Sequence, residues 1–315
     1  MNILVIGGSG FVGHAIVRAL LAEGRTLSLL NRGSRPIAGT TQLTADRNDP
    51  SAVTAALGDR RFDAVVDTNC YTPRQAEILI GALGGRVATA AVITSVAVYA
   101  DNVRQPPAET EPVGGASAWA DYGRGKTEVE HVYAVGGFAA ATALRPPYIC
   151  GPNNNLDRET WFFRRILAGR PVLVPGSGDA WCQFVHEDDL GTAVCAWLRH
   201  APRGFRAFNV ADPQMIATTD LVHRLAGAAG REVEIRCVGT ANGDARAREW
   251  FPFHDVHCTA DPTAFSNAFS WAPAVDLDTR FAEIFKTLSE AGRIPADDWT
   301  PLEERILARL NEGRR

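Results

Sequence analysis

Residues 3–13 read ILVIGGSGFVG, a short apolar run that leads directly into three spaced glycines. Residues 3–6 predict a buried strand, and residues 11–22 have the apolar spacing of a helix. In this context Gly7 can take the tight turn, Gly10 lets backbone amides approach a pyrophosphate, and Gly13 permits close helix packing. The stretch therefore predicts a dinucleotide in a βαβ unit, contacted by Gly7, Gly10, Phe11, Val12 and Gly13.

The alternation of strands and helices continues after this unit. Further strands are predicted at residues 27–30, 41–45, 62–67, 86–94 and 139–144, and helices at residues 50–57, 74–83 and 120–135. Strands that alternate with helices favour parallel pairing through right-handed crossovers. The fold class we expect is α/β, a Rossmann-type doubly wound parallel sheet.

The order loosens after the break Arg145-Pro146-Pro147, and Gly and Pro interrupt the second half. We expect a helix at residues 158–167, short strands at 172–174 and 183–185, and a helix after Asp188. A strand at residues 205–210 can return to the first sheet. These features predict a dinucleotide-binding domain at residues 1–150 and a smaller, interleaved C-terminal substrate lobe at residues 151–315.

The composition excludes several classes of protein. With 315 residues and 46% hydrophobic content, the chain is neither disordered nor a disulfide-stapled miniprotein. No apolar run approaches the about 20 residues that a membrane helix needs. The net charge of −4 gives no global attraction to nucleic acid or an anionic membrane, so we expect neither as a partner. Six cysteines without a CxxC pair, and no signal sequence, predict reduced thiols in a cytoplasmic protein.

One cluster, His254-Asp255-Val256-His257-Cys258, contains residue types that ligate zinc. The alternative is that these residues line a strand or loop beside Phe251 and Phe253. We predict no metal site.

The end of the second predicted strand bears on the choice of cofactor. It reads Leu30-Asn31-Arg32-Gly33-Ser34-Arg35, with no acid at the place where NAD-binding folds hold the ribose hydroxyls. Cations can instead bind a 2′-phosphate, which favours NADP over NAD and predicts contacts at Asn31, Arg32, Ser34 and Arg35. The alternative is that Arg32 and Arg35 are ordinary loop cations, with Arg32 stacked on adenine.

The start of the long predicted helix carries Tyr122-Gly-Arg-Gly-Lys126. The i, i+4 spacing places the phenol and the ammonium on one helix face. A phenol with a pKa of about 10 needs a nearby cation to act as an acid–base catalyst near neutral pH. Lys126 can supply that cation.

The chain resembles the extended short-chain dehydrogenase/reductases, the NAD(P)-dependent epimerase/dehydratase family. Four segments match in order: GGSGFVG at 7–13, TSVAVY at 94–99, the Tyr122/Lys126 pair, and LRPPYICGP at 144–152. The resemblance implies that Ser95 hydrogen-bonds the reacting oxygen, that Tyr122 is the acid–base, and that Lys126 holds the nicotinamide ribose. It also implies cofactor contacts at Tyr122, Lys126, Asp46, Arg47, Thr68, Asn69, Pro146 and Ile149, and substrate contacts at Ser95 and Val96.

The second half is similar to the branch that contains chloroplast stem-loop-binding ribonucleoproteins and their bacterial relatives. The matching segments are ETWFF at 159–163, AGRP at 168–171, FPFHDVHC at 251–258 and SWAP at 270–273. This resemblance makes an RNA-binding protein that keeps the fold an alternative function. A redox-inactive protein that senses NADP is a third alternative.

The function we expect is an NADP-dependent oxidoreductase or epimerase that acts on a secondary alcohol or ketone of a sugar or nucleotide-sugar-like molecule. Family layout implies substrate contacts at Asn154, Asn155, Arg158, Trp161, Trp181 and Gln183. The chain has Cys182-Gln183-Phe184 where many relatives have Arg-Asp-Phe, which weighs against a nucleotide diphosphate substrate. The resemblance also implies a homodimer formed through the helices at 74–83 and 120–135.

Overall fold

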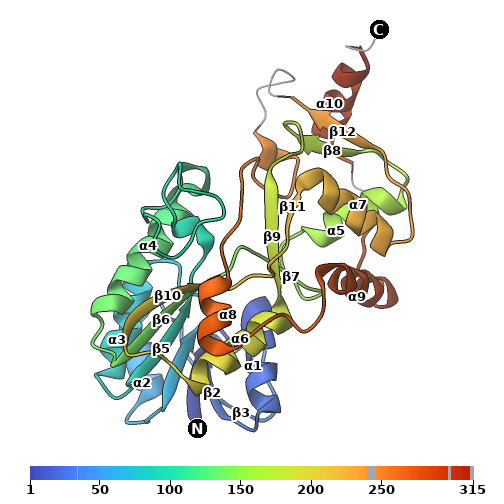
Figure 1. Ribbon diagram of the computed structural model, residues 1–315. Coiled ribbons are helices and arrows are strands. Elements are labelled where there is room, and N and C mark those ends of the chain that lie inside the picture. Colours follow the sequence, from blue (N-terminus) through green and yellow to red (C-terminus); the bar gives the residue numbers. More distant parts are fainter. Residues whose placement is uncertain (34, 240–245, 297–298, 313–315) are drawn as a thin grey trace. The chain divides into compact units, whose positions relative to one another are not determined.

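The computed structural model describes residues 1–33, 35–239, 246–296 and 299–312. The chain forms two compact units (Figure 1). Unit 1 comprises Met1–Ile149, Val185–Pro213 and Ala260–Pro273, and unit 2 comprises Cys150–Phe184, Gln214–Thr259 and Ala274–Arg315.

Unit 1 is built on a seven-stranded sheet in the order β10-β6-β5-β4-β1-β2-β3, with every pair parallel. This order confirms the predicted doubly wound Rossmann-type sheet. The strand at the end of the sheet next to β6 is β10, which comes from the second half of the sequence. The strands are β1 (Asn2–Ile6), β2 (Thr26–Asn31), β3 (Thr40–Thr44), β4 (Ala64–Asp67), β5 (Thr89–Ile93), β6 (Ala140–Arg145) and β10 (Gly204–Asn209).

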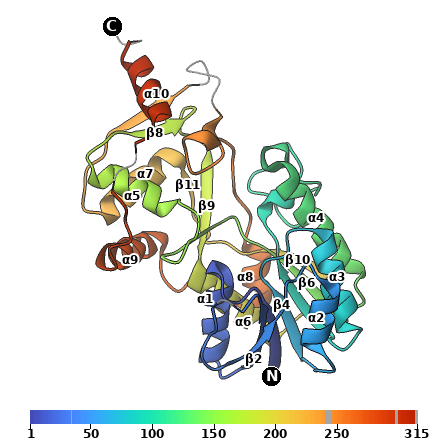
Figure 2. The same ribbon diagram turned by 180° about the vertical axis from the view of Figure 1, so that it is seen from behind.

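Helices cover both faces of this sheet (Figures 1 and 2). Side chains of a strand point alternately to the two faces, so Ile3 and Val5 enter one core and Leu4 and Ile6 the other. The first core is closed by α1 (Phe11–Ala22), α6 (Glu187–Arg199) and α8 (Thr263–Phe269). The second is closed by α2 (Pro50–Leu57), α3 (Pro73–Leu83) and α4 (Ala120–Val135).

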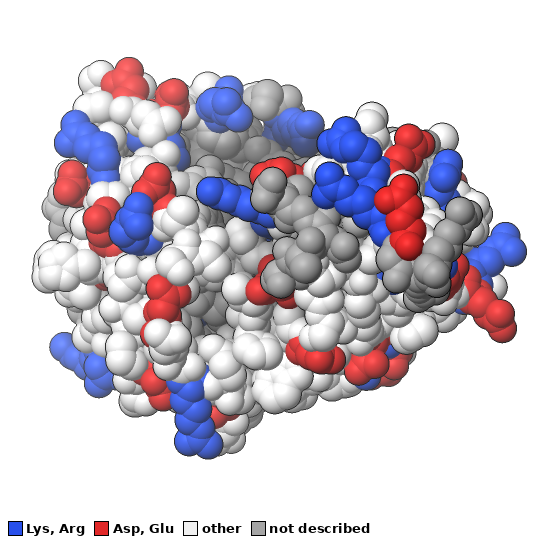
Figure 3. Space-filling model, turned by 90° about the horizontal axis from the view of Figure 1, so that it is seen from above, with Lys and Arg blue, Asp and Glu red and all other residues white. Residues whose placement is uncertain are grey.

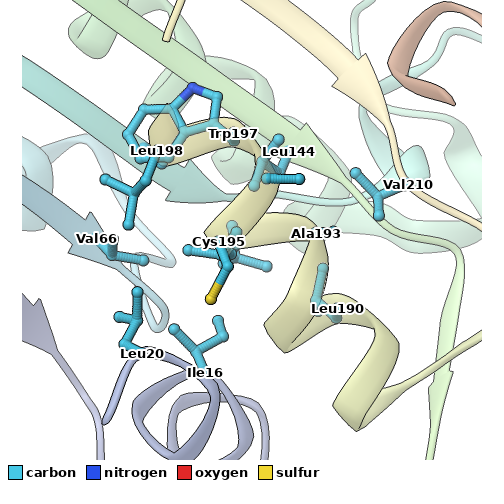
Figure 4. Packing of buried hydrophobic residues seen from close by; sticks show 14 of the residues in the cluster. Ile16, Leu20, Val66, Leu144, Leu190, Ala193, Cys195, Trp197, Leu198 and Val210 are labelled. Atoms are coloured by element: carbon cyan, nitrogen blue, oxygen red, sulfur yellow. The ribbon is translucent and has the colours of Figure 1, made fainter. Parts of the chain in front are cut away.

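The first core depends on close contact between α1 and α6. Figure 4 shows Ile16 and Leu20 of α1 near Cys195 of α6. A Cβ on Gly191 of α6 would lie 2.9 Å from the carbonyl oxygen of Ala15, so the glycine permits this approach. The glycine thereby lets α1 pack directly against α6.

Two helices on the other face, α2 and α3, begin with capping residues. Asp49 caps α2 by accepting hydrogen bonds from the backbone N–H groups of Ser51 and Ala52, and Thr72 caps α3 through the N–H of Gln75. Each cap is followed by a proline, whose missing N–H is not needed in the first helical turn.

Unit 2 combines short strands with four helices among its described residues. Its strands β8 and β12 pair in parallel, and β9 pairs with β11 in antiparallel orientation. An aromatic core of Phe162, Phe251 and Phe253 joins α5 to the segment 251–253, and Phe184 of β9 packs against Phe253. The bounds are α5 (Glu159–Leu167), β8 (Val172–Pro175), β9 (Trp181–His186), β11 (Met215–Ala217), α7 (Thr218–Ala228), β12 (Ile235–Val238), α9 (Leu277–Glu290) and α10 (Pro301–Glu312); β7 (Tyr148–Cys150) leads into the unit.

A buried ion pair attaches the last helix to unit 2. The Arg165 guanidinium of α5 donates two hydrogen bonds of 2.8 Å to the Glu303 carboxylate of α10, and both side chains are 1% exposed. Among the described residues, no helix is both long and apolar enough to cross a membrane.

Candidate active site

The loop between β1 and α1 has the geometry that its glycines predict. Gly7 has a φ of +81°, and a Cβ there would lie 2.6 Å from the Asn69 side chain. A Cβ on Gly13 would lie 2.3 Å from the carbonyl oxygen of Gly7, so only glycine fits at position 13. Around Gly10, the nearest atom would be the Gly7 oxygen at 3.7 Å, which leaves space above the loop.

The same loop leaves the N-terminus of α1 open to an anion. Gly10 occupies the N-cap position, and no side chain of the described residues caps the helix. The unpaired N–H groups and the helix dipole favour a phosphate at this end. Phe11 and Val12 begin the helix and are half-buried. The residues therefore fit a dinucleotide pyrophosphate.

The end of β2 holds the residues predicted to select the cofactor. The Asn31 Oδ1 accepts a hydrogen bond of 2.7 Å from the Gly33 N–H, which shapes the turn after the strand. Arg32 and Arg35 are exposed, and neither guanidinium has an ion-pair or hydrogen-bond partner among the described residues. Ser34 lies outside the described residues. The two cations are accessible to a ligand phosphate.

The loops after β3 and β4 hold four predicted cofactor contacts. Asp46 is exposed, and its Oδ1 accepts from the backbone and side chain of Asn48. The Arg47 guanidinium instead donates to the buried Asp67 carboxylate in two hydrogen bonds of 2.8 Å, and to Asn69 Oδ1 at 2.6 Å. Thr68 donates from its backbone and its hydroxyl to the carbonyl oxygen of Ile6.

Asp67 itself was not among the predicted site residues. Burial alone would raise the pKa of its carboxyl, but the charge and hydrogen bonds of Arg47 hold that pKa below its usual range. Tyr133 of α4 donates a further hydrogen bond of 2.9 Å to it. A carboxylate at the end of an otherwise apolar strand was the signal available in the sequence.

Ser95 follows β5 and begins the short helix η1 (Val96–Val98). Its Oγ accepts from the Ala97 N–H at 3.2 Å, which leaves the hydroxyl proton available to a substrate oxygen. The Val96 N–H donates to the carbonyl oxygen of Pro146 at 3.1 Å. The structure thus brings together the predicted Ser95 and Pro146 segments; Ile149, at the end of the latter, is half-buried.

Buried polar residues hold the loop that follows β5 and contains Ser95. Thr94 donates to Glu130 of α4 at 2.7 Å, and Arg145 at the end of β6 donates to the same carboxylate. The Tyr99 hydroxyl donates to Asn209 of β10 at 2.7 Å. The end of β5 is therefore tied to α4, β6 and β10.

The two glycines between Tyr122 and Lys126 allow α4 to pack closely against the backbone of Ala97 and Tyr71. A Cβ on Gly123 would lie 2.5 Å from the carbonyl oxygen of Ala97, and one on Gly125 would lie 2.7 Å from that of Tyr71. Only glycine permits both approaches. The sequence pattern indicates the shared face of Tyr122 and Lys126, and the structure adds that the glycine at position 123 lets α4 approach the loop after Ser95.

Lys126 is buried and Tyr122 is exposed. The Lys126 Nζ donates to the carbonyl oxygens of Cys70 at 2.7 Å and Ile93 at 3.0 Å, so the third donor of its ammonium remains for a ligand. It lies 5.7 Å from the ring centre of Tyr122, whose side chain is 41% exposed. Burial lowers the pKa of Lys126 to about 8, against the opposing effect of nearby negative groups.

The predicted substrate residues of unit 2 are divided between surface and core. Asn155 and Trp181 are exposed, and Arg158 is half-buried with its guanidinium 5.6 Å from the Phe253 ring centre. Trp161 is 7% exposed and packs edge-on against Phe251, while Gln183 is 1% exposed. Their role in binding substrate stays a prediction.

A buried carboxyl in unit 2 was not among the predicted residues. Glu159 accepts from the Gly151 N–H at 3.2 Å and from the Asn154 amide at 2.9 Å, and burial raises its pKa to about 7. These residues line a cavity of about 230 Å³, together with Asn155, Leu156 and Arg293. An acid in the first turn of a helix is common, so its residue type and position do not indicate that this carboxyl is buried.

The residues of the His254 cluster are engaged in other contacts. The Nδ1 of His257 accepts a hydrogen bond of 3.0 Å from the Trp181 N–H. Among the described residues, no group of three or more His, Cys, Asp or Glu side chains is arranged to hold a metal ion.

Comparison with known proteins places this geometry in a family. The family model described as the NAD dependent epimerase/dehydratase family matches residues 3–211. The chloroplast stem-loop binding protein of 41 kDa b from Arabidopsis thaliana is 31% identical over 88% of this chain and 76% of its own. The 2′-dehydrokanamycin reductase of Streptomyces kanamyceticus is 28% identical over 73% of this chain and 67% of its own.

Solved structures show the same fold. The dTDP-glucose 4,6-dehydratase of Bacillus anthracis, in complex with NAD, superposes with a TM-score of 0.76 over 92% of this chain and 97% of its own, at 14% identity. The matches confirm the predicted fold, family and enzyme class. The chain belongs to the NAD dependent epimerase/dehydratase family.

Proposed function

We propose that the protein is an NADP-dependent oxidoreductase or epimerase that acts on a secondary alcohol or ketone of a sugar or nucleotide-sugar-like molecule. The observation that carries this proposal is the state of Lys126. It is buried and donates hydrogen bonds to two backbone carbonyls, which leaves one N–H of its ammonium for a ligand. The exposed Tyr122 lies one helical turn away. Burial of the Lys126 ammonium costs desolvation free energy, and packing of the helix alone does not require a charged group there. The reductase among the relatives supports the same chemistry.

In the proposed reaction the nicotinamide, when bound, supplies or accepts a hydride. The Ser95 hydroxyl donates a hydrogen bond to the substrate oxygen, and Tyr122 donates a proton to that oxygen during reduction. In oxidation the Tyr122 phenolate takes the proton back. The Lys126 ammonium stabilises the phenolate and donates its third N–H to a ribose hydroxyl of the cofactor.

The preference for NADP rests on Arg32 and Arg35. Both guanidiniums are exposed and lack partners among the described residues, and no carboxylate follows β2 to repel a 2′-phosphate. Binding of NADPH and NADH should be compared by cofactor fluorescence in the wild type, in Arg32→Ala with Arg35→Ala, and in the exposed control Arg104→Ala. We expect the double variant to lose roughly 10- to 100-fold in NADPH affinity and almost nothing in NADH affinity. A wild type that prefers NADH would overturn the assignment.

The acid–base role is tested by Tyr122→Phe. NADPH consumption should be followed with a panel of ketosugars and simple ketones. We expect the variant to lose turnover by on the order of 10³-fold while NADPH affinity stays within about twofold. Unchanged turnover would remove Tyr122 from the mechanism. A wild type that binds NADPH but turns over no carbonyl compound would favour the redox-inactive sensor instead.

RNA binding is a second candidate, because the relative that is 31% identical is named as a stem-loop binding protein. Against it stand the net charge of −4 and the Asp and Glu side chains that lie among the Lys and Arg side chains of the visible face (Figure 3). Electrophoretic shifts with stem-loop RNA at about 150 mM salt decide between the two. A shift that weakens steeply with salt, in protein that does not oxidise NADPH, would support the RNA-binding function.

The cytoplasmic location and the homodimer stay predictions. Size-exclusion chromatography with light scattering tests the dimer directly.

A further inference from the structure

The turn of residues 67–71, which follows β4, contacts three parts of unit 1 that are distant in sequence. On one side, Arg47 donates two hydrogen bonds of 2.8 Å to Asp67 and one of 2.6 Å to Asn69. Asp67 is fully buried, and the Arg47 side chain is 11% exposed. The bidentate pair with Asp67 and the third hydrogen bond to Asn69 hold both ends of the segment from Asp67 to Asn69.

The Asn69 side chain in turn contacts the phosphate loop. It lies so close to the Cα of Gly7 that a Cβ at this position would be 2.6 Å from Asn69 Cγ. Thr68 adds two hydrogen bonds to the carbonyl oxygen of Ile6, the residue before Gly7. A shift of the turn would therefore move the first residue of the phosphate loop.

The other side of the turn contacts α4, the helix that carries Tyr122 and Lys126. The carbonyl oxygen of Cys70 accepts a hydrogen bond of 2.7 Å from Lys126, and Asp67 accepts one of 2.9 Å from Tyr133. The carbonyl oxygen of Tyr71 lies so close to α4 that a Cβ on Gly125 would be 2.7 Å from it. The turn therefore also sets the position of the Lys126 ammonium.

We infer that Arg47 and Asp67 are positioning residues, whose buried ion pair holds the 67–71 turn so that the phosphate loop and Lys126 keep the spacing that one cofactor molecule requires. This inference rests on the proposed function for the identity of the cofactor. It assigns Arg47 a different role from the cofactor contact that its place after Asp46 predicts. Neither residue touches the reacting atoms.

The geometric part can be tested without any ligand, by amide hydrogen exchange. The variants are Arg47→Met, which leaves a buried carboxylate unpaired, and Arg47→Met with Asp67→Asn, which keeps the site neutral if the first variant fails to fold. The control is Arg86→Met, since Arg86 also donates to carbonyls within unit 1, at Leu83 and Ala82. We expect faster exchange both in residues 7–14 and at the start of α4 in the Arg47 variants, and only local changes in the control.

Binding is tested with NADPH and with 2′-phospho-ADP, the adenosine half of NADPH, which lacks the nicotinamide ribose. A positioning role predicts that the double variant loses up to about 100-fold in NADPH affinity and distinctly less in 2′-phospho-ADP affinity. Combined with Lys126→Met, its loss should be less than additive, because both changes disturb the same contact. Arg47→Lys, which keeps the charge, should restore part of the affinity.

Three outcomes would overturn the inference. The first is exchange that rises only within residues 45–49 and 67–71. The second is an equal loss for 2′-phospho-ADP and NADPH, which is the result of a direct contact with the adenosine half. The third is a loss additive with Lys126→Met. If the wild type binds neither NADPH nor NADH, the proposed function fails, while the exchange experiment still decides whether the turn couples the two segments.

Discussion

The two units differ in how their predicted site residues are specified. In unit 1 the predicted residues are glycines that the backbone requires. Gly7 has a positive φ, and Gly13 has no Cβ that would clash with the carbonyl oxygen of Gly7. In unit 2 the predicted residues are side chains that family layout places after the Gly151-Pro152 turn or facing it. The structure places Asn155 on the surface and Trp161 in the core.

This difference has a physical cause. A steric condition on the backbone holds wherever the loop forms, because any Cβ would clash with the same atoms. The direction of a side chain depends on the packing of elements far away in sequence, such as Phe251 against Trp161. Fold and phosphate loop follow from local rules, whereas the lining of a substrate site does not.

The largest stability effect should lie in unit 2, at the Arg165–Glu303 pair. Glu303→Ala leaves a guanidinium buried without its counter-charge, which is expected to lower the free energy of unfolding by roughly 3–5 kcal/mol. Urea denaturation followed by tryptophan fluorescence measures this change. Lys286→Ala, at an exposed pair in the same unit, is the control and should cost less than about 1 kcal/mol. Equal effects of the two substitutions would show that the burial of the pair is not decisive.

The sequence predicted every strand of the large sheet and the helices α1 to α6, because their hydrophobic periods are regular and Gly or Pro separates them. It did not predict α7, α9, α10, β7, β11 or β12. It also did not predict α8, whose Phe265 and Phe269 are buried in the first core of unit 1 against residues far away in sequence. The same limit applies to the site. The Tyr122/Lys126 spacing was visible, but the pairing of Arg47 with Asp67 joins residues 20 positions apart.

In unit 1, two glycines of one motif should respond differently. Gly13→Ala forces the Cβ into the Gly7 carbonyl and is expected to destabilise the protein by about 1–3 kcal/mol. Gly10→Ala meets no protein atom within 3.4 Å, so its stability should change by less than about 0.5 kcal/mol while NADPH affinity still falls. Thermal denaturation and cofactor fluorescence separate the two effects. Equal destabilisation by both would mean that the motif is purely structural.

Lys126 provides a pH-dependent test of burial in unit 1. Burial lowers its pKa from 10.5 to about 8, so between these pH values the unfolded chain binds a proton that the folded chain lacks. The contribution of Lys126 to the free energy of unfolding therefore increases as the pH rises from about 8 to 10.5, by up to about 1.4 kcal/mol per pH unit. The increase is lost as the pH falls back toward 8. The difference between wild type and Lys126→Met, measured by urea denaturation from pH 7 to 10.5, isolates the effect. A constant difference would show that the ammonium is not desolvated.

The smallest effect concerns two neighbouring asparagines of unit 2 that no sequence pattern distinguishes. Asn154 donates to the buried Glu159 and accepts from the Leu156 N–H, whereas Asn155 is exposed and has no hydrogen-bond partner among the described residues. Asn154→Ala should cost about 1 kcal/mol of stability. Asn155→Ala should stay within about 0.5 kcal/mol, so that any rise in the KM for a substrate would report contact with that substrate. If Asn155→Ala is the more destabilising of the two, side-chain positions around this cavity differ from those described, and the contrast between the units weakens.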